Sequence, residues 1–345
     1  TYNLSTPTII QGNRYMDAIT YNGSDGSQKI VNQGQFYPDF VWAKSRNNAT
    51  NNILVDSVRG GNLYLVSNST AADATSTGLA TFSSNGITWT GGASGVNAST
   101  YTYVDWMWNA GSGTTSSNTS GSITSTVSVN TTSGFSIVTW TGNGTNGNIG
   151  HGLGAVPKMI IAKIRSTTDN WIVYHTSLGA TKYIEFNLTN AASTNSGPWN
   201  NTAPTSSLFY VSSTAVWLNN SGSTYIAYCF AEIAGFSAFG SYTGNGSSDG
   251  PFVYCGFRPA YVLVKRTDST GNWYVWDNKR NTYNVMNITL YPNSSTADIT
   301  ASDLTIDCLA NGFKVRGTSI GINASSSTQI YAAFAENPFK YANAR

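Results

Sequence analysis

Charged residues are scarce in this sequence. Lys, Arg, Asp and Glu together make up 10% of the 345 residues, against roughly 25% in an ordinary soluble domain. The net charge of +2 is too small and too scattered to indicate a nucleic-acid partner. No apolar run approaches the roughly 18–20 residues that a membrane helix requires. The sequence therefore predicts neither nucleic-acid binding nor membrane insertion.

Cysteine is almost absent as well. The three residues Cys229, Cys255 and Cys308 form an odd set without a Cys-x-x-Cys pair, which gives neither a disulfide framework nor a zinc site. We expect three buried free thiols, with a Cys229–Cys255 bridge as the alternative.

Motifs that carry catalysis are also missing. The two histidines, His151 and His175, have no counterparts elsewhere in the chain, and His151 lies between two glycines, as is typical of a surface turn. Gly142-Asn143-Gly144 and Gly244-Asn245-Gly246 are fragments of a dinucleotide fingerprint, but they lack its strand–helix context and are read as hairpin turns. No metal-binding, phosphate-binding or nucleophile motif is present. We therefore expect no catalytic residues, no cofactor and no metal, and a protein that is not an enzyme.

The residues that are abundant are polar, small and aromatic. Aromatic residues reach 13%, with 10 Trp and 20 Tyr, and they can supply cores. Asn, Ser, Thr and Gly favour turns and strand surfaces, and the strong formers of exposed helices are few. The composition predicts an all-β protein with many turns.

A landmark recurs three times along the chain. A Pro is followed six residues later by a Lys across an apolar run, and an Arg comes next. The runs are Pro38 to Lys44, Pro157 to Lys163 and Pro259 to Lys265, and the arginines are Arg46, Arg165 and Arg266. Each repeat ends on an apolar aromatic segment that we call the closing strand, ending near Trp108, Phe230 and Phe334. The Pro-to-aromatic distance is 70 residues (38 to 108), 73 (157 to 230) and 75 (259 to 334).

Further landmarks keep the same order. A Gly-rich turn precedes each Pro, a short apolar strand follows each Arg, and a small-residue segment comes after that strand. The small-residue segments are 68–73, 188–193 and 293–298. A fixed order of landmarks at near-constant spacing indicates an internal triplication.

Short strands separated by Gly, Asn and Ser turns predict three tandem β-sandwich-like domains. The expected division is a lead-in over 1–14, copy 1 over 15–110, a Gly/Ser/Thr-rich linker over 111–126, copy 2 over 127–234, copy 3 over 235–339 and a tail over 340–345. Because the second joint is much shorter than the linker, we expect copies 2 and 3 to be docked rigidly and copy 1 to be placed separately.

Within each copy, the run after the Pro reads as a central strand that is buried on both faces. The closing strand is equally apolar and is expected to be central too. We expect each copy to bury its own core, and the recurring Lys44, Lys163 and Lys265 to return the chain to solvent.

Two residue sets deserve comparison with known kinds of site. Glu232 and Glu336 close matched strands, with Asn109 in the same place in copy 1. Recurrence in separate domains favours an architectural role over a catalytic pair. The second set, Trp89, Trp199 and Trp217, lies in polar surroundings. These tryptophans could stack on sugars, although packing of loops or domain joints is the favoured interpretation.

Several phrases of the sequence together resemble a family of phage and prophage virion proteins of tail-fibre type. The phrases span 37–42, 56–60, 139–144, 152–160 and 226–232, and the similarity covers about residues 16 to 339. The resemblance implies a virion surface protein of β-sandwich type. It implies no catalytic or ligand-binding residues.

The leading hypothesis is therefore a tail-fibre or other surface appendage protein that acts in host attachment at the virion surface, outside the cell. The expected partners are other virion proteins, further copies of the chain, most simply in a trimer, and a host surface glycan. Three tandem copies could instead replace the trimer within one chain. A capsid-decoration or head-fibre protein and a secreted carbohydrate-binding protein are the alternatives.

Overall fold

The structure, a computed structural model, describes residues 14–93, 95–214 and 216–335. These residues are nearly all β, and the two helices, α1 (Val216–Asn219) and α2 (Ile320–Asn323), have four residues each. No helix within the described ranges is long and apolar enough to span a bilayer. The all-β prediction is thus confirmed.

The strands fall into three successive units. The first unit contains a six-stranded sheet in the order β1-β9-β3-β4-β5-β6 and a three-stranded sheet in the order β2-β8-β7. Its strands are β1 (Met16–Asn22), β2 (Gln28–Val31), β3 (Phe40–Ser45), β4 (Ile53–Asp56), β5 (Leu63–Val66), β6 (Ala74–Thr75), β7 (Ala80–Ser83), β8 (Gly86–Trp89) and β9 (Thr102–Trp108).

The second unit contains an eight-stranded sheet in the order β10-β11-β12-β19-β14-β15-β16-β17 and the pair β13-β18. Its strands are β10 (Ser116–Asn118), β11 (Ser125–Asn130), β12 (Phe135–Thr141), β13 (Gly147–Gly150), β14 (Pro157–Ile164), β15 (Ile172–His175), β16 (Lys182–Glu185), β17 (Ser193–Thr194), β18 (Leu208–Val211) and β19 (Thr224–Ala231).

The third unit contains a four-stranded sheet in the order β20-β28-β22-β23, a three-stranded sheet in the order β21-β27-β26 and the pair β24-β25. Its strands are β20 (Ser237–Thr243), β21 (Phe252–Tyr254), β22 (Pro259–Arg266), β23 (Trp273–Asp277), β24 (Ile288–Thr289), β25 (Ile299–Thr300), β26 (Ile306–Leu309), β27 (Gly312–Val315) and β28 (Thr328–Ala335).

The same pairing recurs in the three large sheets. The closing strands β9, β19 and β28 each lie between two antiparallel neighbours. On one side is β1, β12 or β20, and on the other is the strand at the recurring Pro, namely β3, β14 or β22. The registers agree, because Phe40 pairs with Trp108, Met159 with Phe230 and Tyr261 with Phe334. Both strands are central in every unit, as predicted. The origin of the three units by triplication stays a prediction.

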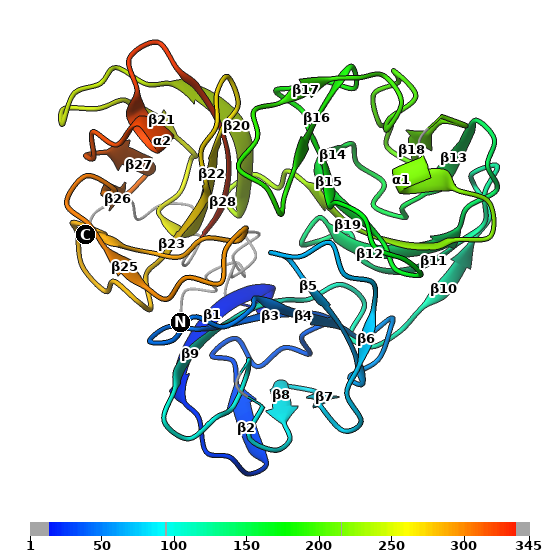
Figure 1. Ribbon diagram of the computed structural model, residues 1–345, viewed down its shortest axis with the longest axis horizontal. Helices are drawn as coiled ribbons and strands as arrows, with labels where there is room; N and C mark the ends of the chain where they lie inside the picture. The colour runs from blue at the N-terminus through cyan, green and yellow to red at the C-terminus, as the bar shows by residue number, and fades with distance from the viewer. Residues whose placement is uncertain (1–13, 94, 215, 336–345) are drawn as a thin grey trace, which may run out of the picture.

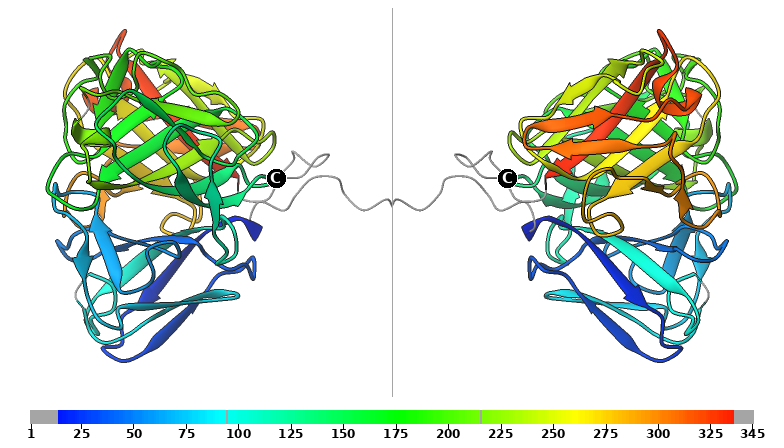
Figure 2. Two further views of the ribbon diagram at one scale, coloured as in Figure 1. Left: turned by 90° about the vertical axis from the view of Figure 1, so that its right-hand side faces the viewer. Right: turned by 90° about the vertical axis from the view of Figure 1, so that its left-hand side faces the viewer.

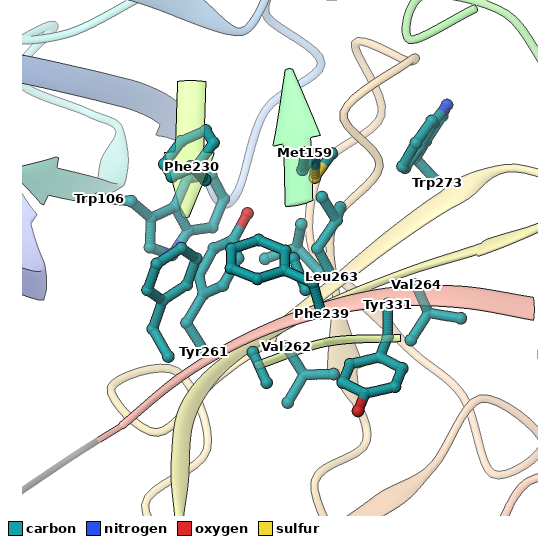
Figure 3. Packing of buried hydrophobic residues seen from close by; sticks show 14 of the residues in the cluster. Trp106, Met159, Phe230, Phe239, Tyr261, Val262, Leu263, Val264, Trp273 and Tyr331 are labelled. Atoms are coloured by element: carbon teal, nitrogen blue, oxygen red, sulfur yellow. The ribbon is translucent and has the colours of Figure 1, made fainter. Parts of the chain in front are cut away.

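Figure 1 shows the three units around a common centre, and Figure 2 shows the first unit lying below the other two in both side views. One face of each large sheet turns toward this centre. There the inner faces form a single apolar cluster that includes Trp106 and Trp108 of the first unit, Phe230 of the second, and Tyr261 and Phe334 of the third. Figure 3 shows Trp106, Phe230 and Tyr261 of this cluster. The ring centroids of Trp108 lie 6.3 Å from Phe230 and 5.8 Å from Phe334.

This central cluster corrects two expectations. The units do not bury wholly separate cores, because alternate residues of β9 and β19 serve different layers and the apolar residues of β28 all belong to the central cluster. In β19, Tyr228 and Phe230 join the central cluster, whereas Cys229 joins a second cluster between the sheets of the second unit. The first unit is also not placed separately, since its residues Trp42, Trp106 and Trp108 belong to the common core.

The Gly/Ser/Thr-rich segment after the first unit is held in place at its start. The buried carboxylate of Asp39 accepts hydrogen bonds from four successive backbone N–H groups, those of residues 110–113, at 2.7–2.9 Å. Further along, the segment forms β10 at the edge of the second unit's sheet. The segment expected to be a linker is therefore ordered by a carboxylate and by strand pairing.

The recurring lysines do not return the chain to solvent. Lys44, Lys163 and Lys265 are fully buried, and each ammonium group donates to the carbonyl of the next residue at 2.7–2.9 Å. Burial is the main cause that lowers the pKa of each to about 8. Their aliphatic stems complete the strand, and their amines cap carbonyls where the strand ends.

The three cysteines are buried, as expected, and none of them forms a disulfide, so Cys229 and Cys255 are not bridged. The lead-in up to residue 13, Glu336 and the tail over 340–345 lie outside the described residues.

A candidate ligand-binding groove

The structure rules out two of the three tryptophans as stacking surfaces. Trp89 is 0% exposed and Trp199 is 1% exposed. The indole N–H of Trp89 donates to Asp105 at 2.8 Å, and Trp199 packs edge-on against Tyr174. Trp217 is half-buried, with its ring centroid 5.6 Å from that of Tyr183. These residues pack loops and layers, which was the favoured interpretation.

The histidines are also buried, so the expectation of a surface His151 is wrong. His151 accepts a hydrogen bond from the backbone N–H of Leu153 at Nδ1, and its Nε2 lies 3.2 Å from the carbonyl oxygen of Thr205. Burial lowers its pKa to about 4. His175 lies in another place, at the contact between the second and third units. The two rings are therefore neutral structural groups in separate regions.

No cluster of three or more metal-ligating side chains occurs in the described part of the chain. The closing-strand positions Asn109 and Glu232 do not meet either, and each serves the turn beside it. Asn109 binds the carbonyl of Tyr37 at 2.8 Å, and Glu232 accepts from the backbone N–H of Phe239 at 3.1 Å.

A surface groove of about 500 Å³ opens where the first unit meets the second. Its wall is built from four separate parts of the chain: the residues before β1, the loop between β2 and β3, the turn between β7 and β8, and the segment from the end of β9 to the end of β11. The lining residues are Arg14, Tyr15, Gly34, Gln35, Phe36, Tyr37, Ser84, Asn109, Ser112 and Asn130.

The side chain of Asn32 holds the loop between β2 and β3 in place. The buried Asn32 amide donates to the carbonyl of Phe36 at 2.7 Å and accepts from its N–H at 2.9 Å. Gln35 has a φ of 54° and uses its own amide to bind the Asn32 carbonyl and Asn85. Because the loop closes on its own side chains, it presents Gln35 and Tyr37 in one arrangement.

The opposite wall is fixed by the amide of Asn109. It donates to the carbonyl of Tyr37 and to Ser112 Oγ, and its oxygen accepts from Asn130 at 2.5 Å. The Tyr37 ring stacks on Phe82 with a centroid distance of 6.1 Å. These contacts join both units, so the groove is formed by the folded chain rather than by a flexible loop.

The groove offers hydroxyl groups, amides and aromatic rings, together with the guanidinium group of Arg14. None of the lining residues is a carboxylate, and the nearby Asp39 is enclosed by backbone N–H groups. Burial, and next the Asp39 carboxylate, raise the pKa of Tyr37, so its hydroxyl stays a neutral donor. Such a surface suits a polyhydroxylated or amide-bearing ligand.

Sequence reasoning missed this groove. Its residues are polar types that are abundant everywhere in the chain, and they come together only through folding. One signal was available: copy 1 has Asp39 directly after its Pro, where the other copies have Lys158 and Ala260.

The comparison with curated proteins and the comparison with solved structures gave no match. A family described as a domain of unknown function, DUF7483, matches residues 11–338. That match covers all three units and both walls of the groove, and the chain therefore belongs to the DUF7483 family.

Proposed function

We propose that this chain is a virion surface protein that takes part in host attachment, and that the groove between its first and second units binds a host surface glycan. The observation that carries the glycan part is the chemistry of the groove. Tyr15 and Tyr37 supply rings, Gln35 supplies an amide and Ser112 a hydroxyl. Rigid aromatic rings beside adaptable hydrogen-bonding groups are a common composition of recognition surfaces.

The virion part of the proposal is supported by the sequence resemblance and by the physical character of the molecule. Polar uncharged surfaces over a shared aromatic core suit a durable extracellular protein. The chain would act as part of a tail fibre or a comparable surface appendage, with other virion proteins as its neighbours.

The oligomeric state belongs to the same proposal. A homotrimer is the prediction from the sequence, and replacement of the trimer by three units in one chain is the alternative. The central cluster favours the alternative, because the inner faces of all three sheets are already buried within one chain. Light scattering of the purified protein would distinguish 36.8 kDa from three times that mass.

Glycan-array binding tests the groove. We expect the intact chain to bind a subset of glycans, and Ser84→Tyr to abolish that binding, because it adds a ring at an exposed position of the wall. Tyr37→Phe should weaken binding by roughly the value of one hydrogen bond, about tenfold. Tyr254→Phe is the matched control, since Tyr254 is 68% exposed on β21, away from the groove.

Equal binding by Ser84→Tyr and the unchanged chain, with equal melting temperatures, would remove the groove from the proposal. Immunogold labelling of intact particles tests the virion part separately. Glycan binding by a chain that labels no particle would favour a secreted carbohydrate-binding protein, whereas labelling by hundreds of copies per particle would favour capsid decoration.

A further inference from the structure

The three units meet at three seams, each named by the two units that it joins. At every seam, the residue that ends β4, β15 or β23 reaches the closing strand of the next unit. Asp56 of the first unit accepts from the Tyr228 hydroxyl of the second at 2.9 Å. Asp277 of the third accepts from the Trp106 indole of the first at 3.0 Å. His175 of the second lies with Nε2 3.1 Å from the Tyr331 carbonyl oxygen of the third.

Two of these seams are ionic. Three residues after each aspartate comes a buried arginine, and the pairs Asp56–Arg59 and Asp277–Arg280 are both 2.6 Å long. A second carboxylate then bridges to the next unit at each seam. Asp73 joins Arg59 to Arg165, and Asp298 joins Arg280 to Arg46, at distances of 2.7–3.0 Å.

The second–third seam carries the same positions with neutral residues. His175 stands in the place of the aspartate, Leu178 in that of the arginine, and Ser193 in that of the bridging carboxylate. Arg266 pairs instead with Asp268 of its own unit at 2.9 Å. Two ionic groups still bind across this seam: the Lys265 ammonium donates to the Thr189 carbonyl at 3.1 Å, and the Glu232 carboxylate accepts from the backbone N–H of Phe239 at 3.1 Å.

The hydrogen bonds of His175 define its protonation state. Nδ1 accepts from the backbone N–H of Ser177 at 3.2 Å, so the ring proton lies on Nε2 and is donated to Tyr331. A second proton on Nδ1 would point at the Ser177 N–H, so that two hydrogen-bond donors would face each other and the bond would be lost. Ala332, in the place of Trp106 and Tyr228, leaves room for the imidazole to lie against the strand backbone.

We propose that the second–third seam is a built opening point of the molecule, and that protonation of His175 in mildly acidic solution favours transient opening between the second and third units there while the two ionic seams stay closed. This inference is independent of the glycan groove. It rests on the contrast between the three seams at matched positions.

The direction of the pH effect follows from the buried state of the ring. Burial is the main cause that lowers the pKa of His175 from 6.5 to about 4, and the Tyr331 carbonyl opposes it. The titratable side chains on the elements that pack against it are Lys158 and Lys163 on β14, Lys182, Tyr183 and Glu185 on β16, and Tyr331 on β28. Closure is thus favoured fully above pH 6.5, and this contribution is lost as the pH falls toward 4. If His175 regains its ordinary pKa when the seam opens, the equilibrium constant for opening rises roughly 30-fold between pH 7.5 and pH 5.

Two indole N–H groups report on the seams under identical conditions. Trp273 donates across the second–third seam to the Glu185 carbonyl at 2.9 Å, and Trp171 donates across the first–second seam to the Val66 carbonyl at 3.0 Å. Hydrogen exchange of both can be followed by NMR in one sample. Their ratio cancels the intrinsic pH dependence of exchange. We expect Trp273 to gain roughly 30-fold over Trp171 on going from pH 7.5 to pH 5.

The chain supplies a matched control for the variant. His151 has the same pair of contacts and the same lowered pKa of about 4, but both of its partners lie within the second unit. His175→Gln should abolish the acid-dependent gain at Trp273, and His151→Gln should leave it intact. An unchanged Trp273-to-Trp171 ratio in the unsubstituted protein would overturn the proposal even if His175→Gln does not fold. Retention of the gain in a folded His175→Gln protein would overturn it too.

Discussion

The ionic first–second and third–first seams differ in chemistry from the neutral second–third seam, although all three place the same strand ends in the same positions. The ionic seams hold buried carboxylate–arginine pairs, whereas the neutral seam holds a histidine and a leucine. Buried ion pairs add little net stability, because desolvation offsets their attraction, but leaving one partner alone is very costly. We infer that the ionic seams mainly specify which sheets adjoin, and that closure itself comes from the shared apolar core.

The largest effect that tests this comparison is expected from Arg59→Leu. Arg59 is buried and binds Asp56, Asp73, the Leu54 carbonyl and the Tyr228 hydroxyl. Its removal leaves the buried Asp56 without its cationic partner and Asp73 with Arg165 alone, and we expect a loss of about 3–5 kcal/mol in the free energy of unfolding. Urea denaturation measures the loss. Arg316→Leu is the control, because its side chain is 40% exposed and its pair with Asp307 should contribute less than about 1 kcal/mol.

Replacing the ionic residues of the first–second seam by those of the second–third seam tests whether the ion pairs add net stability. The triple variant Asp56→His, Arg59→Leu, Asp73→Ser leaves no buried charge unpaired, and Arg165 is 20% exposed. We therefore expect the triple variant to be more stable than Arg59→Leu alone, despite carrying more substitutions. A triple variant less stable than the single one would show that the ionic contacts contribute net stability.

An intermediate effect is expected from removing one donor at each ionic seam. Tyr228→Phe deletes the hydroxyl that donates to Asp56, and Trp106→Phe deletes the indole N–H that donates to Asp277. Each change keeps an aromatic ring but leaves a buried carboxylate one bond short, at a cost of about 1–3 kcal/mol. Thermal denaturation should show the larger loss for Trp106→Phe, because this change also removes part of a fully buried ring that lies 5.5 Å from the Arg280 guanidinium. Tyr331→Phe is the control, since its hydroxyl makes a 3.5 Å contact within the third unit.

Much of the sheet structure could be predicted from the sequence, because its signals are local. The apolar runs that begin at Pro157 and Pro259 become β14 and β22, with each Pro as the first residue, where a missing N–H is tolerated. The closing strands are apolar throughout because they are central and buried on both faces. A strand buried on both faces shows no alternation, however, so nothing in the sequence says which face meets its own unit and which meets the other two.

The seams and the groove depend on contacts between distant residues and were not predicted. The sequence shows no counterpart for His175, and only the strand register shows that His175 and Asp56 end equivalent strands. The sequence does not show that the recurring lysines are buried, because a long side chain at a strand end can point inward when carbonyls are available to its amine. The groove collects ordinary polar residues such as Gln35 and Asn130, which composition does not distinguish from the surface.

The smallest expected effect comes from substituting two arginines at matched positions, one at an ionic seam and one at the neutral seam. Arg165 pairs across the first–second seam with Asp73, whereas Arg266 pairs within its own unit with Asp268, which is 40% exposed. We expect Arg165→Gln to cost about 1 kcal/mol and Arg266→Gln about half as much, because exposed pairs are screened by water. Salt should reduce the first loss less than the second, since a partly buried pair is shielded from ions. Equal losses with equal salt dependence in urea denaturation would mean that bridging a seam adds nothing to a salt bridge, and the contrast between ionic and neutral seams would then reduce to the buried arginines alone.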